Sequence, residues 1–345
     1  MLNPPDSLTL DTRPSHSLFS DIVSHLKLSI LHWPVWWRAQ SFFKKIIPIG
    51  LLGAYLLSLS LLGGLKSDHI TLCSILLILS YSGPIFKSLY DFLFPFFLTV
   101  VIYDSQRYYS DYIRGPIHVA EPYRFDQLFF GISTPQGILT PNEWWQLHTH
   151  PLLDLITGFA YLVFFSVFIL NAAYFLFVLG RKGVQHLSAF EVTHRARMMP
   201  WGFFWLNLLG YSTYYWYAAA PPWYVAQYGL GPAQLGVPAS TAGCARFDQL
   251  LGTHFFSEMY GRSADVFGAI PSLHIAYPLL AVVFAFQFKR ARLFCLSFYF
   301  LMCFSALYLN HHYMLDILWG SAYALIIGYF MTLYSRKRLS YALES

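Results

Sequence analysis

Three ionisable residues at the ends of apolar segments have the types and spacing needed for chemistry. His274 lies at the start of the apolar segment 272–288, and His312 and Asp316 flank the start of the segment 314–334. Ionisable side chains are costly beside long apolar segments, so they are candidates for function wherever they occur there. Two imidazoles and one carboxylate are the groups that general acid–base and nucleophilic catalysis most often use.

His312 and Asp316 are four residues apart, which places both side chains on one face of a helix. The carboxylate can accept the Nδ1 proton of the imidazole, which fixes the tautomer and leaves a lone pair on Nε2. An imidazole held in this way is a nucleophile or a base, and His274 can then act as the acid for a leaving group. The spacing therefore favours a site built from His274, His312 and Asp316.

Each of these patterns also has a purely structural interpretation. A His-x-x-x-Asp pair can be a hydrogen bond that only supports a helix, and Pro271-Ser272 before a helix is ordinary capping chemistry. A metal site would need a third ligand, which His311 could supply beside His274 and His312. Adjacent residues on a helix point about 100° apart, which makes joint ligation by His311 and His312 awkward. We therefore expect no metal and no other cofactor.

The composition requires a membrane protein. Of 345 residues, 56% are hydrophobic and 11% are charged, whereas soluble domains are about 25% charged. The 32 Phe, 25 Tyr and 10 Trp exclude a disordered chain. The apolar residues form long unbroken runs and not the short alternating segments of a barrel. The prediction is an all-α, polytopic bundle of membrane helices, and the net charge of +5 gives no reason to expect nucleic acid.

Eight apolar segments are candidates for membrane spans, and a span needs roughly 20 residues. They are 46–64, 70–86, 89–103, 152–179, 201–219, 272–288, 293–309 and 314–334. The segments 70–86 and 89–103 are short, close together and interrupted by Pro84 and Pro95. The sequence therefore predicts six to eight spans, with eight favoured.

Basic residues distinguish the two sides of the predicted bundle. With both ends inside, 16 of the 22 basic residues lie in inside stretches and six lie outside, as the positive-inside rule requires. The long stretches 104–151 and 220–271 then lie on the outer side, where His274, His312 and Asp316 lie at one depth. We expect an N-terminal segment 1–103 with two or three helices, a catalytic membrane domain 104–335 and a basic cytoplasmic tail 336–345.

The sequence Arg-Phe-Asp-Gln-Leu occurs twice, at 124–128 and at 246–250. The residues around the two copies do not repeat, so a duplicated domain is excluded. Both copies lie in the predicted outer stretches. We interpret them as similar amphipathic turns at the membrane surface.

Pro271-Ser272-Leu273-His274 followed by His312-x-x-x-Asp316 resembles the type-2 phosphatidic acid phosphatase superfamily. The resemblance implies a six-helix lipid-phosphatase-like core in which the later histidine is the phosphorylated nucleophile. An aspartate orients it, and the earlier histidine protonates the leaving alcohol. The matching residues are His312, Asp316 and His274.

Further motifs are similar to the inositol phosphorylceramide synthase branch of that superfamily. They are Ala219-Ala220-Pro221-Pro222-Trp223-Tyr224, Ala245-Arg246-Phe247-Asp248, Phe267 to His274, Tyr308-Leu309-Asn310-His311-His312-Tyr313, His118-Val119-Ala120-Glu121-Pro122-Tyr123 and Leu139-Thr140-Pro141-Asn142-Glu143. The resemblance covers about residues 100–335. It implies transfer of phosphoinositol from phosphatidylinositol to ceramide.

Two departures from the superfamily pattern affect the phosphate site. Its third motif begins Ser-Arg, whereas this chain has Ser305-Ala306, and the cationic first motif is not recognisable near 213–224. Phosphate-binding groups must then come from elsewhere. The candidates are Arg246, Arg262, Ser272 and His311, and the candidates for binding inositol hydroxyls are Asp248, Glu121 and Asn142.

The low number of cations favours a phosphodiester substrate, which carries one negative charge where a monoester carries nearly two. The expected partners are therefore phosphatidylinositol and ceramide or a related lipid alcohol, in a multi-pass membrane protein whose site faces the outer side. The short end Ala342-Leu343-Glu344-Ser345 favours a bacterial inner membrane, and a Golgi lumen is the alternative.

Other functions remain open at the level of sequence. A lipid phosphate or pyrophosphate phosphatase would use the same three residues with water, and related transferases would move phosphoethanolamine or phosphocholine. A transporter with a His and Asp proton relay predicts ionisable residues in the middle of several spans. The sequence instead concentrates them at one membrane face.

Overall fold

The computed structural model describes residue 31 and residues 33–135, 137–261 and 266–344. Its elements are helices apart from one small antiparallel hairpin of β1 (Ile132–Thr134) and β2 (Gly137–Leu139), in which Thr134 faces Gly137. The prediction of an all-α bundle is therefore confirmed. The chain divides into two compact units, Met1–Phe94 and Pro95–Ser345.

The first unit contains α2 (Phe42–Leu61), α3 (Ser67–Tyr81) and the beginning of α4 (Pro84–Ser105). Ser41 caps α2 by accepting a hydrogen bond from the backbone of Lys44 at 3.4 Å. Between α3 and α4 the chain passes through Gly83, whose φ of 109° is open to glycine and strained for other residues. The apolar stretch 70–103 is therefore two helices.

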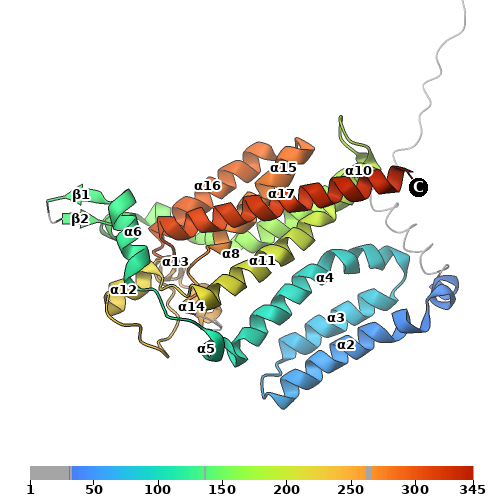
Figure 1. The fold of residues 1–345 in the computed structure, drawn as a ribbon, viewed down its shortest axis with the longest axis horizontal. Coiled ribbons are helices and arrows are strands. Elements are labelled where there is room, and N and C mark those ends of the chain that lie inside the picture. The colour runs from blue at the N-terminus through green and yellow to red at the C-terminus, as the bar shows by residue number, and fades with distance from the viewer. Residues whose placement is uncertain (1–30, 32, 136, 262–265, 345) are drawn as a thin grey trace, which may run out of the picture. The chain divides into compact units, whose positions relative to one another are not determined.

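The second unit is a bundle whose central helix is α15 (Leu273–Phe288). Its other long elements are α8 (Pro151–Ala173), continued by the π-helical turn η2 (Tyr174–Leu179) and α9 (Gly180–Lys182), α11 (Met198–Trp216), α16 (Arg292–Tyr308) and α17 (Met314–Glu344). α15 packs against α8, α11, α16 and α17 (Figure 1), and most of its residues are buried. A helix that is apolar on every face is stable only when neighbours surround it.

All eight predicted apolar segments coincide with helices. By length and composition, four helices of the described chain are able to cross a membrane: Phe42–Leu61, Phe86–Tyr108, Pro151–Lys182 and Met314–Tyr341. Ser67–Tyr81, Leu273–Phe288 and Arg292–Tyr308 are shorter apolar helices, and α11 has 19 residues. The chain is therefore an integral membrane protein.

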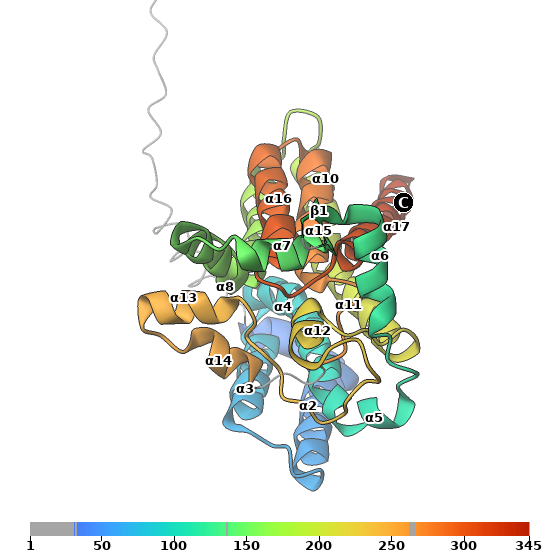
Figure 2. The same ribbon diagram turned by 90° about the vertical axis from the view of Figure 1, so that its left-hand side faces the viewer.

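The stretches predicted to lie outside the membrane fold into short helices that gather at one end of the bundle (Figures 1 and 2). They are η1 (Gln106–Tyr108), α5 (Ser110–Ile113), α6 (Ala120–Phe130), α7 (Pro141–Leu147), α12 (Pro222–Tyr228), α13 (Cys244–Leu251) and α14 (Phe255–Tyr260). The remaining short helix, α10 (Ala189–Ala196), lies at the other end, beside the C-terminal part of α17.

Ala219 joins the two outer stretches through its backbone. It forms parallel bridges with His118 on one side and with Gly268 on the other. Its amide donates to Phe267 O at 2.8 Å, and His118 donates to Ala218 O at 2.8 Å. Through this pairing, the segment around Gly268 that leads into α15 lies beside Ala219, which in turn lies beside His118 of the other outer stretch.

α15 and α17 approach closely where the predicted site begins. A Cβ added at Gly320 would lie 2.3 Å from the backbone oxygen of Ser272, so only glycine allows this approach. The amide of Ser272 donates to Asp316 O at 3.0 Å. Because of this contact the starts of α15 and α17, and with them His274 and Asp316, share one end of the bundle.

Candidate active site

The structure brings His274, His312 and Asp316 together. His312 Nδ1 lies 3.2 Å from Asp316 Oδ2, and His312 Nε2 lies 3.2 Å from His274 Nδ1. Asp316 is fully buried and His312 is 6% exposed. The three side chains therefore form a connected chain of hydrogen bonds that is mostly closed to water.

The backbone of Ala269 determines which tautomer His312 adopts. Its carbonyl oxygen lies 3.1 Å from Nδ1 of His312, and a carbonyl can only accept. The hydrogen of the neutral ring is therefore on Nδ1, shared between Ala269 O and the Asp316 carboxylate. The lone pair is then on Nε2, facing His274, which donates from its own Nδ1. Asp316 is held in turn by the amide of Tyr313, which donates to Oδ2 at 3.0 Å.

Burial keeps the nucleophile candidate neutral. It lowers the pKa of His312 from 6.5 to about 4, and the Ala269 carbonyl opposes part of that shift. Burial and the two neighbouring histidines also lower the pKa of His311 well below its ordinary value. A neutral His312 has the free Nε2 lone pair that attack on phosphorus requires.

A stack of four aromatic rings holds the two other histidines. Tyr260 stacks on His311 with ring centroids 4.9 Å apart, His311 on Tyr161 at 5.4 Å, and Tyr161 on His274 at 4.8 Å. Phe164 contacts the His274 ring at 4.7 Å. The orientation of His274 is thus set by packing against α8, which carries Tyr161 and Phe164.

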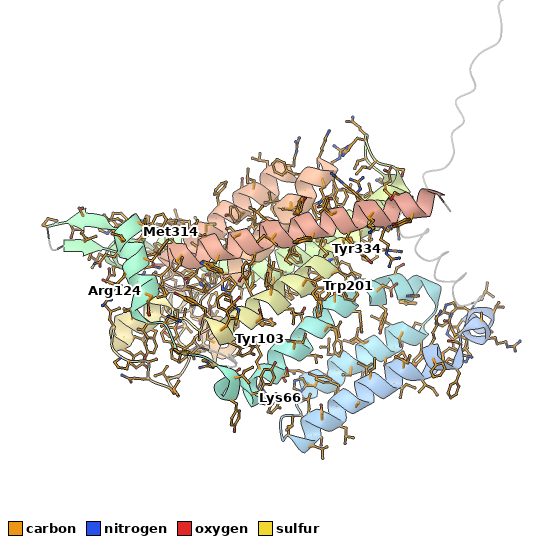
Figure 3. All side chains as sticks on the ribbon, viewed as in Figure 1. Lys66, Tyr103, Arg124, Trp201, Met314 and Tyr334 are labelled. Atoms are coloured by element: carbon orange, nitrogen blue, oxygen red, sulfur yellow. The ribbon has the colours of Figure 1, made fainter. Side chains whose placement is uncertain are left out.

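Side chains from the outer loops hold the segment 307–315, which carries His312. The side-chain amide of Asn142 donates from Nδ2 to Leu307 O at 3.1 Å and to His312 O at 3.0 Å. Asp126 accepts from the first amides of α17, those of Met314 at 2.7 Å and Leu315 at 3.1 Å. A carboxylate there stabilises the helix start by capping and by its charge. In Figure 3, Met314 and Arg124, which is on α6 two residues before Asp126, lie at the same end of the bundle.

Arg246 is not brought to the histidine pair. Its guanidinium donates to Asp154 Oδ1 at 2.6 Å, to Gln146 Oε1 at 3.0 Å and to Tyr308 O at 3.3 Å, and it lies over the Tyr308 ring. All of these contacts support the segment that leads to His312. In this structure Arg246 therefore braces the backbone and does not line the space beside His274.

The other predicted phosphate ligands have different positions. Arg262 lies outside the described residues. His311 lines the space beside His312, but its Nε2 is 3.1 Å from Thr241 O and its Nδ1 is 3.4 Å from Tyr260 OH. Ser272 is fully buried at the start of α15, and its hydroxyl has no hydrogen-bond partner in the described part of the chain. Of these, only His311 lies beside the histidine pair.

The repeated Arg-Phe-Asp-Gln-Leu sequence forms the helices α6 and α13, and the aspartate of each copy caps another helix. Asp126 caps α17, as described above. Asp248 accepts from the amides of Phe256 at 3.0 Å and Ser257 at 3.2 Å at the start of α14. The repeat therefore marks a capping device, a role that its sequence context does not indicate.

None of the candidate inositol ligands lines the space beside the histidines. Asp248 caps α14, Asn142 holds the backbone of the nucleophile segment, and the exposed Glu121 lies 3.2 Å from Nδ1 of His118.

A cavity of about 750 Å³ opens beside His274 and His312. Its walls are mostly aromatic and aliphatic and come from α4 after Pro95, α8, α11, α14 and α15. Pockets of this size and character suit organic ligands with long apolar parts. No lysine or arginine is found among its lining residues in the described ranges.

Ala306 takes the place of the arginine in the usual superfamily motif, and its position explains how the chain accommodates the change. Ala306 is fully buried, and its carbonyl accepts from the amides of His311 at 3.1 Å and His312 at 3.2 Å. It belongs to the same core cluster as Tyr161 and Cys244. The position is part of the core here and supplies no cation.

Several residues that position the site escape sequence reasoning. Tyr161 is one aromatic residue in a long apolar helix, and the Ala269 carbonyl has no side-chain signature at all. Among the described residues, no group of three or more His, Cys, Asp and Glu side chains is arranged to hold a metal ion.

Comparison with known proteins agrees with this geometry. The family model of the PAP2 superfamily matches residues 138–330, which is more than half of the chain and includes His274, His312 and Asp316. The chain belongs to the PAP2 superfamily, so the resemblance drawn from its motifs is confirmed.

Three curated relatives belong to one branch of the superfamily, the inositol phosphorylceramide synthases and their bacterial counterparts. The chain is 32% identical to phosphoinositol dihydroceramide synthase of Bacteroides thetaiotaomicron over 81% of its own length and 88% of that protein. It is 31% and 28% identical to the inositol phosphorylceramide synthase catalytic subunits of Schizosaccharomyces pombe and Saccharomyces cerevisiae. These matches cover 66% and 68% of the chain but only 50% and 54% of the fungal proteins. No solved structure matches the chain.

Proposed function

We propose that this chain is a lipid phosphotransferase that moves phosphoinositol from phosphatidylinositol to ceramide through a phosphohistidine. The observation that carries the proposal is the pair His312 and His274, 3.2 Å apart at the wall of an apolar cavity. The names of the bacterial and fungal relatives give the substrates. The catalytic domain is 104–335, with 1–103 as an N-terminal membrane segment and 336–345 as a basic tail.

In the first half-reaction Nε2 of His312 attacks the phosphorus of phosphatidylinositol. A nitrogen–phosphorus bond forms while the bond from phosphorus to the diacylglycerol oxygen breaks, and His274, acting as an imidazolium, gives a proton to that oxygen and becomes neutral. The positive charge on the His312 ring is balanced by Asp316 through Nδ1. Because the two imidazoles are 3.2 Å apart, the His274 ring must turn away to admit phosphorus.

In the second half-reaction the hydroxyl of ceramide attacks the phosphohistidine. His274 takes the hydroxyl proton, an oxygen–phosphorus bond forms, and the bond to Nε2 of His312 breaks. Two in-line displacements give net retention at phosphorus. No step draws on a group beyond the two lipids and the three side chains.

The absence of a lysine or arginine from the described cavity wall supports a diester donor. A diester has one negative charge to be neutralised, whereas a monoester has nearly two. Hydrolysis of phosphatidic acid, a monoester, would place more charge against a described wall that has no lysine or arginine. Transfer from a phosphodiester lipid, which brings one negative charge into the cavity, is more compatible with a wall that lacks these cations in its described part.

The proposed site faces the outer side of a bacterial inner membrane. The excess of basic residues in the inside stretches supports this orientation. The similarity to a Bacteroides protein along 81% of the chain supports a bacterial membrane over a Golgi membrane. Both lipids would then enter from the outer leaflet, at the depth where α15 and α17 begin.

Purified protein in detergent, incubated with fluorescent ceramide, tests the proposal. Reactions contain or lack phosphatidylinositol, contain a chelator throughout, and are resolved by lipid mass. We expect inositol phosphorylceramide only when phosphatidylinositol is present, and none from His312→Ala that elutes and unfolds like the native protein. Phosphate released from phosphatidic acid or an isoprenyl pyrophosphate, without the ceramide product, would place the chain among lipid phosphatases instead.

A further inference from the structure

Gln106 is a polar residue that lines the cavity and has no role in the catalytic steps described above. It begins η1, immediately after α4, and lines the same cavity as His274 and His312. The residue is 1% exposed, and neither Nε2 nor Oε1 has a hydrogen-bond partner among the residues that the structure describes. The side chain therefore has one donor group and one acceptor group free beside the cavity.

Two other polar side chains of this wall, those of Asn207 and Thr99, are already hydrogen-bonded. Asn207 accepts from Tyr277 OH at 2.5 Å and donates to Phe203 O at 2.8 Å. Thr99 donates to Pro95 O at 2.9 Å. Buried amides without partners are rare in folded proteins, and each one calls for an explanation such as a missing ligand. Gln106 differs from its neighbours in this respect.

The residues before Gln106 indicate which part of a lipid it would meet. Phe96, Val100 and Tyr103 line the cavity at helical spacing on α4, and Gln106 follows three residues later. An apolar stripe that ends in an amide matches a hydrocarbon chain that ends in a polar linkage. A headgroup with many hydroxyls would instead need a polar wall.

We infer that Gln106 binds the secondary amide of the ceramide acceptor, and the inference rests on the proposed function. Gln106 Oε1 accepts from the amide N–H, and Nε2 donates to the oxygen of the neighbouring ceramide hydroxyl, because the N–H and C=O of a trans amide point in opposite directions. Diacylglycerol has ester oxygens that accept and no N–H, so it would leave Oε1 unpaired. Gln106 is then a specificity residue that favours ceramide over diacylglycerol.

This selectivity has a direct consequence for the reaction. Diacylglycerol released in the first half-reaction can attack the same phosphohistidine and regenerate phosphatidylinositol, because its hydroxyl replaces that of ceramide without any other change. A group that binds the ceramide amide raises the fraction of phosphohistidine that reacts with ceramide and not with diacylglycerol. Gln106 lines the same cavity as His274 and His312 and takes no part in proton transfer.

The test compares three acceptors on the full-length protein in detergent: ceramide, N-methylceramide, which lacks the N–H, and labelled diacylglycerol, which exchanges into phosphatidylinositol. Gln106→Met keeps the side-chain volume and removes both polar groups. For this variant we expect kcat/KM for ceramide to fall about 10- to 100-fold, the range for a lost pair of buried hydrogen bonds. Exchange of diacylglycerol should fall much less, because an ester can lose only the hydrogen bond from Nε2, and the preference for ceramide over N-methylceramide should disappear.

The control is Gln234→Met, an exposed glutamine outside the cavity, which should behave like the native protein. If Gln106→Met slows diacylglycerol exchange as much as ceramide transfer, or slows neither, the inference is wrong. If that variant does not fold, equal rates for ceramide and N-methylceramide in the native protein overturn the inference. A native protein that makes no inositol phosphorylceramide contradicts the proposed function itself, which is a separate result.

Discussion

At the scale of single residues, the function depends on how one imidazole is held. His312 donates from Nδ1 to two buried acceptors, Ala269 O and the Asp316 carboxylate, and so presents Nε2 to His274. Ala269 O would hold the tautomer even without Asp316, but only the carboxylate carries the charge that balances a positive ring. Removing that charge and removing the hydrogen bond are therefore separable effects.

Replacing Asp316 by Asn tests the role of the charge. The amide keeps the size of the side chain but cannot stabilise the positive ring, so we expect kcat to fall by about 10² to 10⁴. The substrate KM should change little, because Asp316 does not line the cavity. Steady-state kinetics on protein with an unchanged unfolding temperature would show it, and a variant with near-native kcat would remove Asp316 from the mechanism.

The pH dependence of the first half-reaction reports the state of His312. Burial lowers its pKa to about 4, and attack needs the neutral ring. Activity should therefore persist as the pH falls through 6.5 and be lost only as it approaches about 4. Charged or titratable neighbours of the ring are His274, His311 and Asp316. Formation of labelled phosphohistidine at each pH measures this limb, and a midpoint at or above 6.5 would contradict the assignment.

At the scale of elements, the outer loops act as a brace for the segment that carries His312. α6 holds the start of α17 through Asp126, and α7 holds the backbone of Leu307 and His312 through Asn142. α13 adds Arg246, which contacts the carbonyl of Tyr308. These contacts explain why long stretches outside the apolar segments are ordered against the site.

The two capping aspartates provide a matched test of this brace. Asp126→Ala and Asp248→Ala each remove a carboxylate that accepts two backbone amides, so each should cost about 1 kcal/mol of stability. Only Asp126 caps the helix that carries Asp316, so we expect a clear loss of kcat in Asp126→Ala and a smaller one in Asp248→Ala. Thermal unfolding and kinetics on both variants would decide it, and equal losses of kcat would argue against a specific brace.

The close approach of α15 and α17 gives a second prediction at this scale. Gly320→Ala places a methyl group 2.3 Å from the Ser272 backbone oxygen, so the helices must separate at an overpacking cost of about 1–3 kcal/mol. We expect lower thermal stability and lower activity. Gly50→Ala in α2 is the control, because nothing lies within 4 Å of its added methyl, and alanine there should stabilise the helix by about 0.5–1 kcal/mol. Similar unfolding temperatures for the two variants would contradict the tight contact.

At the scale of the whole molecule, α17 connects the site to the opposite face of the membrane. Its 31 residues span about 46 Å at 1.5 Å per residue, which exceeds a hydrocarbon core of about 30 Å. Figure 3 places Met314 and Tyr334 toward opposite ends of this helix. The proposed outer site and basic inner tail are therefore compatible with a single crossing.

Labelling of single cysteines tests the orientation. The four native cysteines are buried or half-buried, so the background should be low. Leu235→Cys lies in the stretch 220–271, where Leu235 is 70% exposed, and Ser340→Cys lies near the exposed end of α17. An impermeant maleimide added to intact cells should label the first and reach the second only after permeabilisation. The reverse pattern would place the site on the inner side.

The sequence by itself determined the features that depend on local spacing. Unbroken apolar runs predict helices, and each of the eight predicted runs overlaps at least one helix. The spacing of four residues placed His312 and Asp316 on one turn, where they are hydrogen-bonded. Such contacts follow from helix geometry alone and need no knowledge of how the helices pack. The sequence motifs also predicted membership of the superfamily, and the match to its family model confirms that prediction.

Only the tertiary structure decided the contacts between distant segments. The contact of His312 with His274 joins residues 38 apart, and its contact with Ala269 joins residues 43 apart. Arg246 donates a hydrogen bond to Asp154, which is 92 residues away in the sequence. The loop sequence around Arg246 did not predict this contact and was equally compatible with a phosphate ligand. The position of Gln106 at the cavity wall depends likewise on packing. A side chain's type and spacing limit what it can do, but its partners depend on which helices pack together and how closely.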